Sequence, residues 1–380
     1  MDYIYIFGAG ASAGKHSSYG RDSWLMDSEY KLLPSNRIVQ YNQVLPTIYR
    51  IADRVEAMSK RLESLIMSSH FNPDDADKIK TVSKQLHDLS WYLNRESYPD
   101  IYAETLYMIN KQKYNEFIKI FNLYLIIEQM CSGVDQRYKV FFTNLIQRTE
   151  QKLLPSNIKI FSWNYDYQME EAFYEKRSLV GHFDQFMNNV LLNPLDFTKI
   201  TTDFVSVKLN GYAPKLKHNN HDNLKDETMN CISSSNPIYF NIDEEGRRNR
   251  THAIGKKIVE LFDYLFIDLY NPSLRFAWQI DSANEIIQSL KKLKGSITTK
   301  EIIIIGYSFP ALNTKIDSAL LNIFRPPFKV YLQVYKDDFE TIKARVDAIL
   351  KSISGEHREI IFVDPNQDFF IPYNLLRDLK

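Results

Sequence analysis

The feature that most constrains the fold of this chain is a set of short apolar runs, spread along nearly its whole length. They lie at residues 3–7, 158–161, 205–209, 302–305, 330–334 and 360–363. Short runs that are nearly continuous, such as residues 3–7 and 302–305, are typical of strands covered on both faces of a parallel sheet. Several are followed by helical patterns, as after Asp337 and Asp338. Strands that alternate with helices predict an α/β protein with a Rossmann-like, doubly wound parallel sheet.

Residues 36–150 follow a different pattern. They are rich in Tyr and Phe and almost free of glycine, and their apolar residues recur at helical spacing. We therefore expect a large helical insertion at 36–150, which divides a Rossmann-like domain into the segments 1–35 and 151–380. The stretch 218–251, dense in Asn, Asp, Ser and charge, reads as a long loop. Ser282 and Glu285 form a capping box that predicts the start of a further helix.

Composition excludes several classes of protein. Lys plus Arg and Asp plus Glu both number 47, so the chain lacks the basic footprint of a dedicated nucleic-acid binder. Cys131 and Cys231 are the only cysteines, which rules out a four-thiolate zinc site and a disulfide framework. We expect no metal and a reducing cytoplasm. No apolar stretch is long enough for a signal peptide or a membrane span, so we expect a soluble protein.

A glycine-rich segment, GAGASAG at residues 8–14, directly follows the first predicted strand. This is where a nucleotide-binding loop lies in doubly wound folds, because glycines let backbone amides approach a pyrophosphate at a helix N-terminus. The spacing GxGxxxG differs from the GxGxxG of ordinary dehydrogenases, and no GK[ST] follows as in a Walker loop. The alternative is a tight strand-to-helix turn without a ligand.

The sequence WNYD places Asn164 and Asp166 at the end of the second predicted strand. Polar groups at a carboxyl-terminal strand end face the crevice in which α/β proteins bind ligands, and an amide and a carboxylate there can hold sugar hydroxyls. Alternatively, Asp166 forms an Asx turn that caps a helix beginning at Gln168. Both interpretations can hold together.

Two later strands also end in groups that could contact a ligand. Four isoleucines at 302–305 run into Gly306-Tyr307-Ser308, a small hydrogen-bonding turn. The strand at 330–334 runs into Tyr335, which could contact an adenosine. For each, a plain buried strand with an ordinary turn is an equally good interpretation.

Taken in order, GAGAS, WNYD, KLNG (residues 208–211) and IIGYS resemble the sirtuin-like superfamily. The chain looks most like the bacterial sirtuin-like proteins of antiphage defence, which lack the zinc-binding module of protein deacylases. The resemblance covers residues 1–20 and 155–370 but not the helical insertion. It implies an enzyme that uses NAD⁺ as its substrate and cleaves the nicotinamide–ribose bond. Such an NADase depletes NAD and thereby causes abortive infection.

The resemblance also assigns roles to individual residues. Gly8, Ala9, Gly10 and Ser12 would cradle the NAD pyrophosphate. Asn164 would hold the nicotinamide ribose and the attacking water, and Asp166 would support that pocket. Gly306 and Ser308 would lie beneath the phosphates and the adenine ribose, and Tyr335 would approach the adenosine.

One position departs from the family pattern. The family has a catalytic His before a glycine, whereas this chain has Asn210 before Gly211, and Asn cannot act as a general base. The chain is then an engineered inactive variant, a natural variant that relies on Asn164, or an NAD- or ADP-ribose-binding regulatory module without turnover. His16 and His182 are the nearest alternative bases by sequence, although such histidines more often lie on the surface or in packing.

The resemblance further implies partners. Such NADases form homo-oligomers, often beside a HerA-type ring ATPase, and would meet nucleic acid only indirectly through that partner. We expect an oligomer larger than a dimer, built partly through the aromatic faces of the helical insertion. An NAD-dependent oxidoreductase is disfavoured, because no acidic residue closes a strand about 20 residues after the glycines.

Overall fold

The computed structural model describes residues 2–9, 11, 51–68, 71–95, 99–132, 134–146, 154–177, 206–218, 228–230, 244–267, 270–294, 297–324, 328–354 and 359–378. The chain divides into two compact units. The sheet unit consists of Met1–Ser12, Gln136–Gly211 and Arg275–Lys380. The helical unit consists of Ala13–Asp135 and Tyr212–Leu274.

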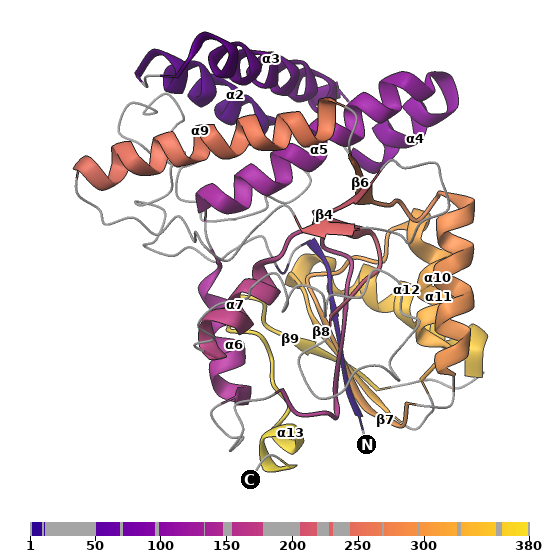
Figure 1. The fold of residues 1–380 in the computed structure, drawn as a ribbon. Coiled ribbons are helices and arrows are strands. Elements are labelled where there is room, and N and C mark those ends of the chain that lie inside the picture. The colour runs from indigo at the N-terminus through magenta and orange to yellow at the C-terminus, as the bar shows by residue number, and fades with distance from the viewer. Residues whose placement is uncertain are drawn as a thin grey trace. The chain divides into compact units, whose positions relative to one another are not determined.

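The sheet unit is built on a six-stranded parallel sheet, with strand order β3-β2-β1-β7-β8-β9 (Figure 1). Each apolar run of the sequence supplies one of these strands, which confirms the predicted Rossmann-like α/β fold. The strands are β1 (Asp2–Phe7), β2 (Ile158–Ser162), β3 (Ser206–Lys208), β7 (Thr299–Ile305), β8 (Lys329–Gln333) and β9 (Ile360–Val363).

Helices cover both faces of this sheet, which explains why its strands are apolar on both sides (Figure 1). Alternate residues such as Ile4 and Ile6 of β1 pack in one core with α10, α11 and α12. On the opposite face, Tyr5 and Phe7 pack against Phe141 of α6. The helices of the sheet unit are α6 (Gln136–Ile146), α7 (Gln168–Arg177), α10 (Ile280–Leu293), α11 (Thr314–Leu321), α12 (Lys336–Ser354) and α13 (Tyr373–Asp378).

The strand order locates the crevice of the sheet. Counted in chain order among themselves, the six strands run 3-2-1-4-5-6, the order of dinucleotide-binding folds. Chain connections leave β1 and β7 in opposite directions, so the crevice opens at the carboxyl ends of these two neighbours. Gly8 and Gly306 directly follow β1 and β7 and therefore lie at this switch point.

The predicted capping box at Ser282 and Glu285 is wrong. Helix α10 begins at Ile280, and its N-cap residue Gln279 makes no side-chain cap bond. The Gln279 Oε1 instead accepts a hydrogen bond from the backbone N–H of Phe276 at 2.9 Å. Glu285 lies inside the helix and forms an ion pair with Arg275 at 3.1 Å. The Glu285 carboxylate therefore pairs with Arg275, which precedes the helix, and does not cap the helix N-terminus.

The helical unit differs from the insertion that the sequence predicted at 36–150. Its second segment adds α9 and a small sheet of order β5-β4-β6, whereas α6 belongs to the sheet unit. The stretch 218–251 is thus not one long loop, because it contains β5 and the start of α9. The elements of this unit are α2 (Ile51–Ser68), α3 (Pro73–Arg95), α4 (Pro99–Ile109), α5 (Lys111–Ser132), α9 (Glu244–Phe266), β4 (Gly211–His218), β5 (Thr228–Asn230) and β6 (Tyr270–Leu274).

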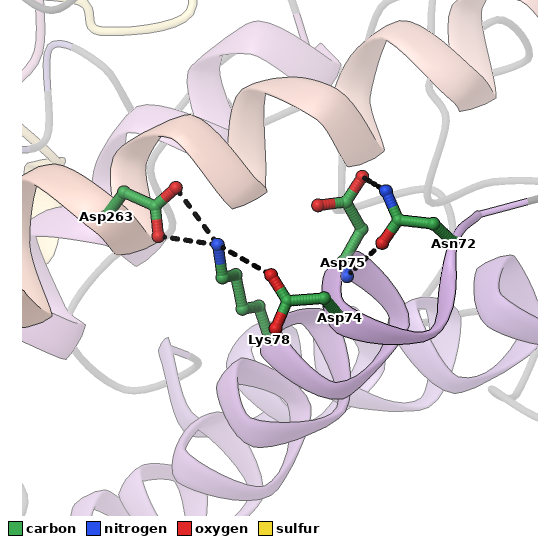
Figure 2. Close-up of polar contacts among 5 residues, drawn as sticks. All are labelled: Asn72, Asp74, Asp75, Lys78 and Asp263. Atoms are coloured by element: carbon green, nitrogen blue, oxygen red, sulfur yellow. Dashed lines mark hydrogen bonds and ion pairs between the residues drawn. The ribbon is translucent and has the colours of Figure 1, made fainter.

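The contacts of Asn72 explain why helix α3 begins at Pro73 (Figure 2). Asn72 is the cap: its Oδ1 accepts from the Asp75 N–H at 2.8 Å, and its Nδ2 donates to the Asp75 carboxylate at 2.9 Å. Pro73 occupies the first helical position, where no N–H is needed. One turn later, Lys78 reaches the Asp263 carboxylate of α9 at 2.9 Å and Asp74 at 3.3 Å.

Helix α5 is buried without interruption from Ile120 to Gln129. Its buried residues surround the helix axis, as expected of a helix at the centre of a bundle. Asn122 and Glu128 are buried among them and interrupt the apolar run. Across the described ranges, no helix combines the length and the apolar character that crossing a membrane requires.

Candidate functional site

The turn after β1 requires a glycine because two strand ends meet there. Gly8 is buried, its N–H donates to the Ile305 carbonyl at 3.0 Å, and its own carbonyl accepts from the Ala11 N–H at 2.9 Å. A Cβ on Gly8 would lie 2.6 Å from the Cα and Cβ of Tyr307 and 2.7 Å from the Gly306 carbonyl oxygen. The glycine therefore lets the ends of β1 and β7 approach each other directly.

The rest of the glycine segment is described in part. Ala9 is exposed, whereas Ala11 is buried and its carbonyl accepts a hydrogen bond from Arg137 Nη2 at 2.8 Å. Gly10 and Ser12 lie outside the described residues. Binding of a pyrophosphate by this segment therefore stays a prediction. The structure describes the tight turn at Gly8 with which the segment begins.

Tyr307, directly after Gly306, anchors the end of β7 through a buried polar network. Its hydroxyl donates to the Asp317 carboxylate, with O–O distances of 2.9 and 3.0 Å, and accepts from Asn313 Nδ2 at 2.9 Å. Burial raises the pKa of Asp317 well above its usual range, although the Tyr307 hydrogen bond partly opposes that effect. The network fixes Tyr307 from helix α11.

The loop that follows carries local backbone strain. Gly306 has φ 61°, and Phe309 has φ 51°, a value that is rare for a bulky side chain and costs about 1–3 kcal/mol. Arg345 of α12 donates to the Ser308 carbonyl at 2.8 Å. Ser308 itself is exposed. A strained loop persists only where its surroundings hold it, and Arg345 and the Tyr307 network do so here.

The residues that follow β2 and β7 contact each other, and Gly8, which follows β1, lies beside them. The Trp163 ring stacks on the Tyr307 ring, with centroids 5.5 Å apart and an interplanar angle of 13°. Asn164 follows and is buried, and its N–H donates to Ser162 Oγ at 3.1 Å. Strands on either side of β1 thus hold aromatic rings in contact beside the buried amide of Asn164.

Asp166 acts as a helix cap. Its Oδ1 accepts a hydrogen bond from the Gln168 N–H at 3.1 Å, which confirms the Asx-turn interpretation. Its backbone carbonyl accepts from Lys208 Nζ at 2.6 Å. Because the side chain is buried and committed to the first turn of α7, Asp166 shapes the loop that carries Asn164.

Beneath this loop lies a buried ion pair. Lys208 Nζ is 3.3 Å from a carboxylate oxygen of Glu170, and both side chains are almost fully buried. The same carboxylate oxygen accepts a hydrogen bond from Ser206. Burial raises the pKa of Glu170, and the neighbouring Lys208 and Ser206 lower it in part. The pair ties helix α7 to the strand end that leads to Asn210.

Asn210 is buried beside Trp163. Its Nδ2 donates to the Trp163 carbonyl at 3.3 Å, and its own backbone carbonyl accepts from the Arg275 N–H at 2.8 Å. No donor in the described part of the chain reaches its Oδ1, although that atom is buried. Gly211 follows with φ 82°, a conformation that favours glycine.

The predicted residues are therefore brought together in part. Contacts link Asn210 to Trp163, Trp163 to Tyr307, and Tyr307 to Gly8, so the ends of β3, β2, β7 and β1 form one continuous group. Tyr335 follows β8 and is exposed, and none of the described side-chain contacts joins it to this group. His16 and His182 lie outside the described residues.

Sequence reasoning missed several residues that hold this group. They come from helices or strands far along the chain, and no local motif marks them: Arg137, Glu170, Lys208, Asp317 and Arg345. Of these residues, only Lys208 belongs to one of the sequence motifs, KLNG. The described residues contain no group of three or more His, Cys, Asp or Glu side chains placed to hold a metal ion.

Comparison with known proteins adds no family to this description. The sequence matches no protein-family model. A search of curated proteins likewise finds no match.

Proposed function

We propose that this protein is an NAD⁺ hydrolase, a sirtuin-like NADase that releases nicotinamide and ADP-ribose. The observation that carries the proposal is the continuous group of strand ends at the switch point of a 3-2-1-4-5-6 sheet. There, Gly8 adjoins Gly306 and Tyr307. The buried Asn164 directly follows Trp163, and the buried Asn210 donates from Nδ2 to the Trp163 carbonyl. A dinucleotide crevice lined by buried amides suits a substrate rich in hydroxyl groups.

The proposed reaction breaks the C–N bond between nicotinamide and the ribose. Nicotinamide leaves as a neutral molecule with the bonding electron pair, water adds to the ribose carbon, and one proton is released. The transition state resembles an oxocarbenium ion, so positioning and electrostatics supply most of the acceleration. Asn164 has an amide that can accept a hydrogen bond from a ribose hydroxyl or from the attacking water.

The described residues favour a mechanism without a strong base. Asn210 cannot accept a proton at its amide, and Asp166 is committed to a helix cap. The buried Oδ1 of Asn210 can accept a hydrogen bond from a substrate hydroxyl beside Trp163. A cationic sugar that forms before water attacks needs little base assistance, because water bound to such a cation is already acidic.

The direct test is to incubate the purified protein with NAD⁺ and to follow nicotinamide and ADP-ribose by chromatography. Asn164→Ala should lower turnover by about 100-fold or more, because the positioning group is lost. Asn366→Ala, at an exposed turn, is the matched control and should retain activity. An Asn164→Ala protein with wild-type turnover would remove Asn164 from the mechanism.

A second candidate is a regulatory module that binds NAD or ADP-ribose without turnover. Asn210 favours it, because this side chain stands at the position of the family base and is anchored to the Trp163 carbonyl. The two candidates separate through Asn210→His. Tight ADP-ribose binding without hydrolysis, in both the wild type and Asn210→His, supports the regulatory module. Hydrolysis by the wild type supports the NADase.

We also propose that the protein works in the cytoplasm as an antiphage effector, in a homo-oligomer beside a HerA-type ring ATPase. Helices α3 and α4 support an assembly role, because they expose several large apolar side chains. These are Trp91, Tyr92, Ile101, Tyr107, Met108 and Ile109. Light scattering at micromolar concentration tests the assembly: a monomer, alone and with a co-expressed ring ATPase, would overturn it.

A further inference from the structure

A buried carboxyl on α11 holds the loop that follows β7. Asp317 is 1% exposed, and its two carboxylate oxygens lie 3.0 and 2.9 Å from the Tyr307 hydroxyl that donates to them. Asn313, directly before α11, donates to the same hydroxyl from its Nδ2 at 2.9 Å. Tyr307 and Asn313 are buried as well. The hydroxyl is therefore engaged both as a donor and as an acceptor, which fixes the direction of the Tyr307 ring.

The Tyr307 ring contacts the residues that follow the neighbouring strands. It stacks on Trp163 with centroids 5.5 Å apart, and a Cβ added to Gly8 would lie 2.6 Å from the Tyr307 Cα and Cβ. The Trp163 carbonyl in turn accepts from Asn210 Nδ2 at 3.3 Å. Close-packed interiors transmit small shifts between side chains in contact. A change in the direction of the Tyr307 ring would therefore move Trp163 and the backbone carbonyl that orients the Asn210 amide.

Packing alone does not account for a carboxyl at this position. Burying a carboxyl costs free energy, and an apolar side chain of similar size would fill the same space without that cost. Burial raises the pKa of Asp317 well above its usual range, whereas Tyr307 and Trp163 lower it in part. The two residues that stack at the crevice are thus the two that favour this carboxylate. A carboxyl also supplies directional hydrogen bonds, which an apolar side chain cannot.

We propose that Asp317 is a positioning residue of the crevice, which fixes the Tyr307–Trp163 stack through the Tyr307 hydroxyl. The inference rests on the proposed function, because it assigns a further residue to the same crevice. Asp317 acts through Tyr307 and does not touch the ligand. Its effect is measured on the ADP-ribose moiety, which NAD⁺ and the proposed product share.

The competing explanation is that this network only stabilises the sheet unit. A contact of that kind changes the free energy of unfolding and leaves the ligand affinity of the folded protein unchanged. A positioning contact lowers the affinity of protein that is fully folded. Tyr3 supplies the matched control, because its hydroxyl also donates to a carboxylate on a helix, that of Asp378, at 2.8 Å. Tyr3 lies near the start of β1, at the opposite end of the parallel strands.

The experiment measures ADP-ribose binding by calorimetry on the full-length protein, at a temperature at which circular dichroism shows every variant to be folded. Tyr307→Phe removes the hydroxyl and keeps the ring, and Asp317→Leu removes the acceptor. We expect each to weaken binding by about tenfold. The double variant should lose no more than either single variant, because both changes remove the same hydrogen bond. Tyr3→Phe should bind as the wild type does.

Asp317→Asn tests the hydrogen bond separately from the carboxyl. Its amide oxygen still accepts from the Tyr307 hydroxyl. This variant should therefore keep most of the affinity that Asp317→Leu loses. Affinity that follows the presence of an acceptor for Tyr307 distinguishes positioning from a general loss of packing.

Wild-type affinity in Tyr307→Phe or in Asp317→Leu would overturn the proposal. So would an equal loss in Tyr3→Phe, losses that add up in the double variant, or an Asp317→Asn protein that binds as weakly as Asp317→Leu. A wild type that does not bind ADP-ribose also overturns it. Should Asp317→Leu fail to fold, the proposal stands only if Tyr307→Phe loses affinity while Asp317→Asn and Tyr3→Phe keep it.

These outcomes are independent of turnover. A protein whose ADP-ribose affinity depends on Tyr307 and Asp317 as expected, but which releases no nicotinamide from NAD⁺, contradicts the NADase and leaves this inference standing. A protein that hydrolyses NAD⁺ and binds ADP-ribose equally well in Tyr307→Phe does the reverse.

Discussion

The sheet unit and the helical unit use charged side chains in different ways. In the sheet unit, Lys208 and Glu170 are 3.3 Å apart, and their side chains are 1% and 0% exposed. In the helical unit, Lys78 and Asp263 are 2.9 Å apart, with side chains 19% and 39% exposed. The closer pair, which Figure 2 draws, is thus the more exposed one. Distance alone therefore does not rank the two interactions.

Burial decides what each pair does. Water screens an exposed pair and solvates either partner when the other is removed, so such pairs contribute little. A buried pair has lost its water, so each charge depends on the other and on nearby hydrogen bonds. Lys208 also holds the Asp166 carbonyl, which fixes the loop before α7. The buried Lys208–Glu170 pair therefore fixes the backbone near the strand ends of the sheet unit, although burying both charges costs desolvation energy. The exposed Lys78–Asp263 pair joins two helices through a contact that water can replace.

Lys208→Met should have the largest effect on stability. It leaves Glu170 buried without its cation and frees the Asp166 carbonyl, so the free energy of unfolding should fall by about 3–5 kcal/mol. Urea denaturation measures this loss. Adding Glu170→Gln to Lys208→Met should recover part of it, because the uncompensated charge is gone. A Lys208→Met protein of wild-type stability would show that the pair is not coupled.

Gly8→Ala should cause the second largest loss of stability. Gly255 of the helical unit provides the matching glycine for comparison. Its new Cβ meets the backbone of Gly306 and Tyr307, which cannot yield, so we expect a loss of about 1–3 kcal/mol. Gly255→Ala in the helical unit meets the ring of Phe71, a side chain that can turn away, and should lose less. Thermal unfolding of both variants measures the difference. The reverse order would contradict the close approach at the end of β1.

The third prediction concerns the pH dependence of stability. The pKa of Asp317 is raised in the folded state by burial, so the folded protein prefers the protonated carboxyl. The corresponding stability is fully present below the unfolded-state pKa and is lost as pH rises through the folded-state pKa. Asp317→Asn cannot ionise. From about pH 4 to about pH 8, its free energy of unfolding should therefore rise relative to that of the wild type. Urea denaturation across this range tests it, and parallel profiles would contradict the assignment.

The sheet was predictable from sequence because its strands are covered on both faces. Several contain a continuous apolar run, such as Ile302 to Ile305, that can be recognised without knowledge of the neighbouring strands. Helix α9 was not predictable in the same way. Its first turns read EEGRRNRT, and the stretch before them is polar, so the start of the helix resembled a loop. The apolar residues that define it, such as Ile254 and Ile258, come later.

The candidate site was predictable only where local motifs mark it. Gly8, Asn164 and Asn210 follow strands, so the sequence indicated their common edge before the structure brought them together. Arg137 and Asp317 were missed, because each reaches its partner from another element through tertiary contact. The single sequence contains no signal that pairs such distant positions. Burial and hydrogen bonding of the folded chain supply that pairing.

Lys78→Met should have the smallest effect and completes the comparison. Asp263 raises the pKa of Lys78 more than Asp74 does, which marks the bridge between α3 and α9 as its stronger contact. Both carboxylates are partly or largely exposed, so water replaces the ammonium when it is removed. The methylene stem of Met keeps the packing, and the denaturation midpoint should stay almost unchanged, at low and at high salt alike. A loss as large as that of Lys208→Met would mean that burial does not separate the two pairs, since the exposed bridge would then hold its unit as firmly as the buried one.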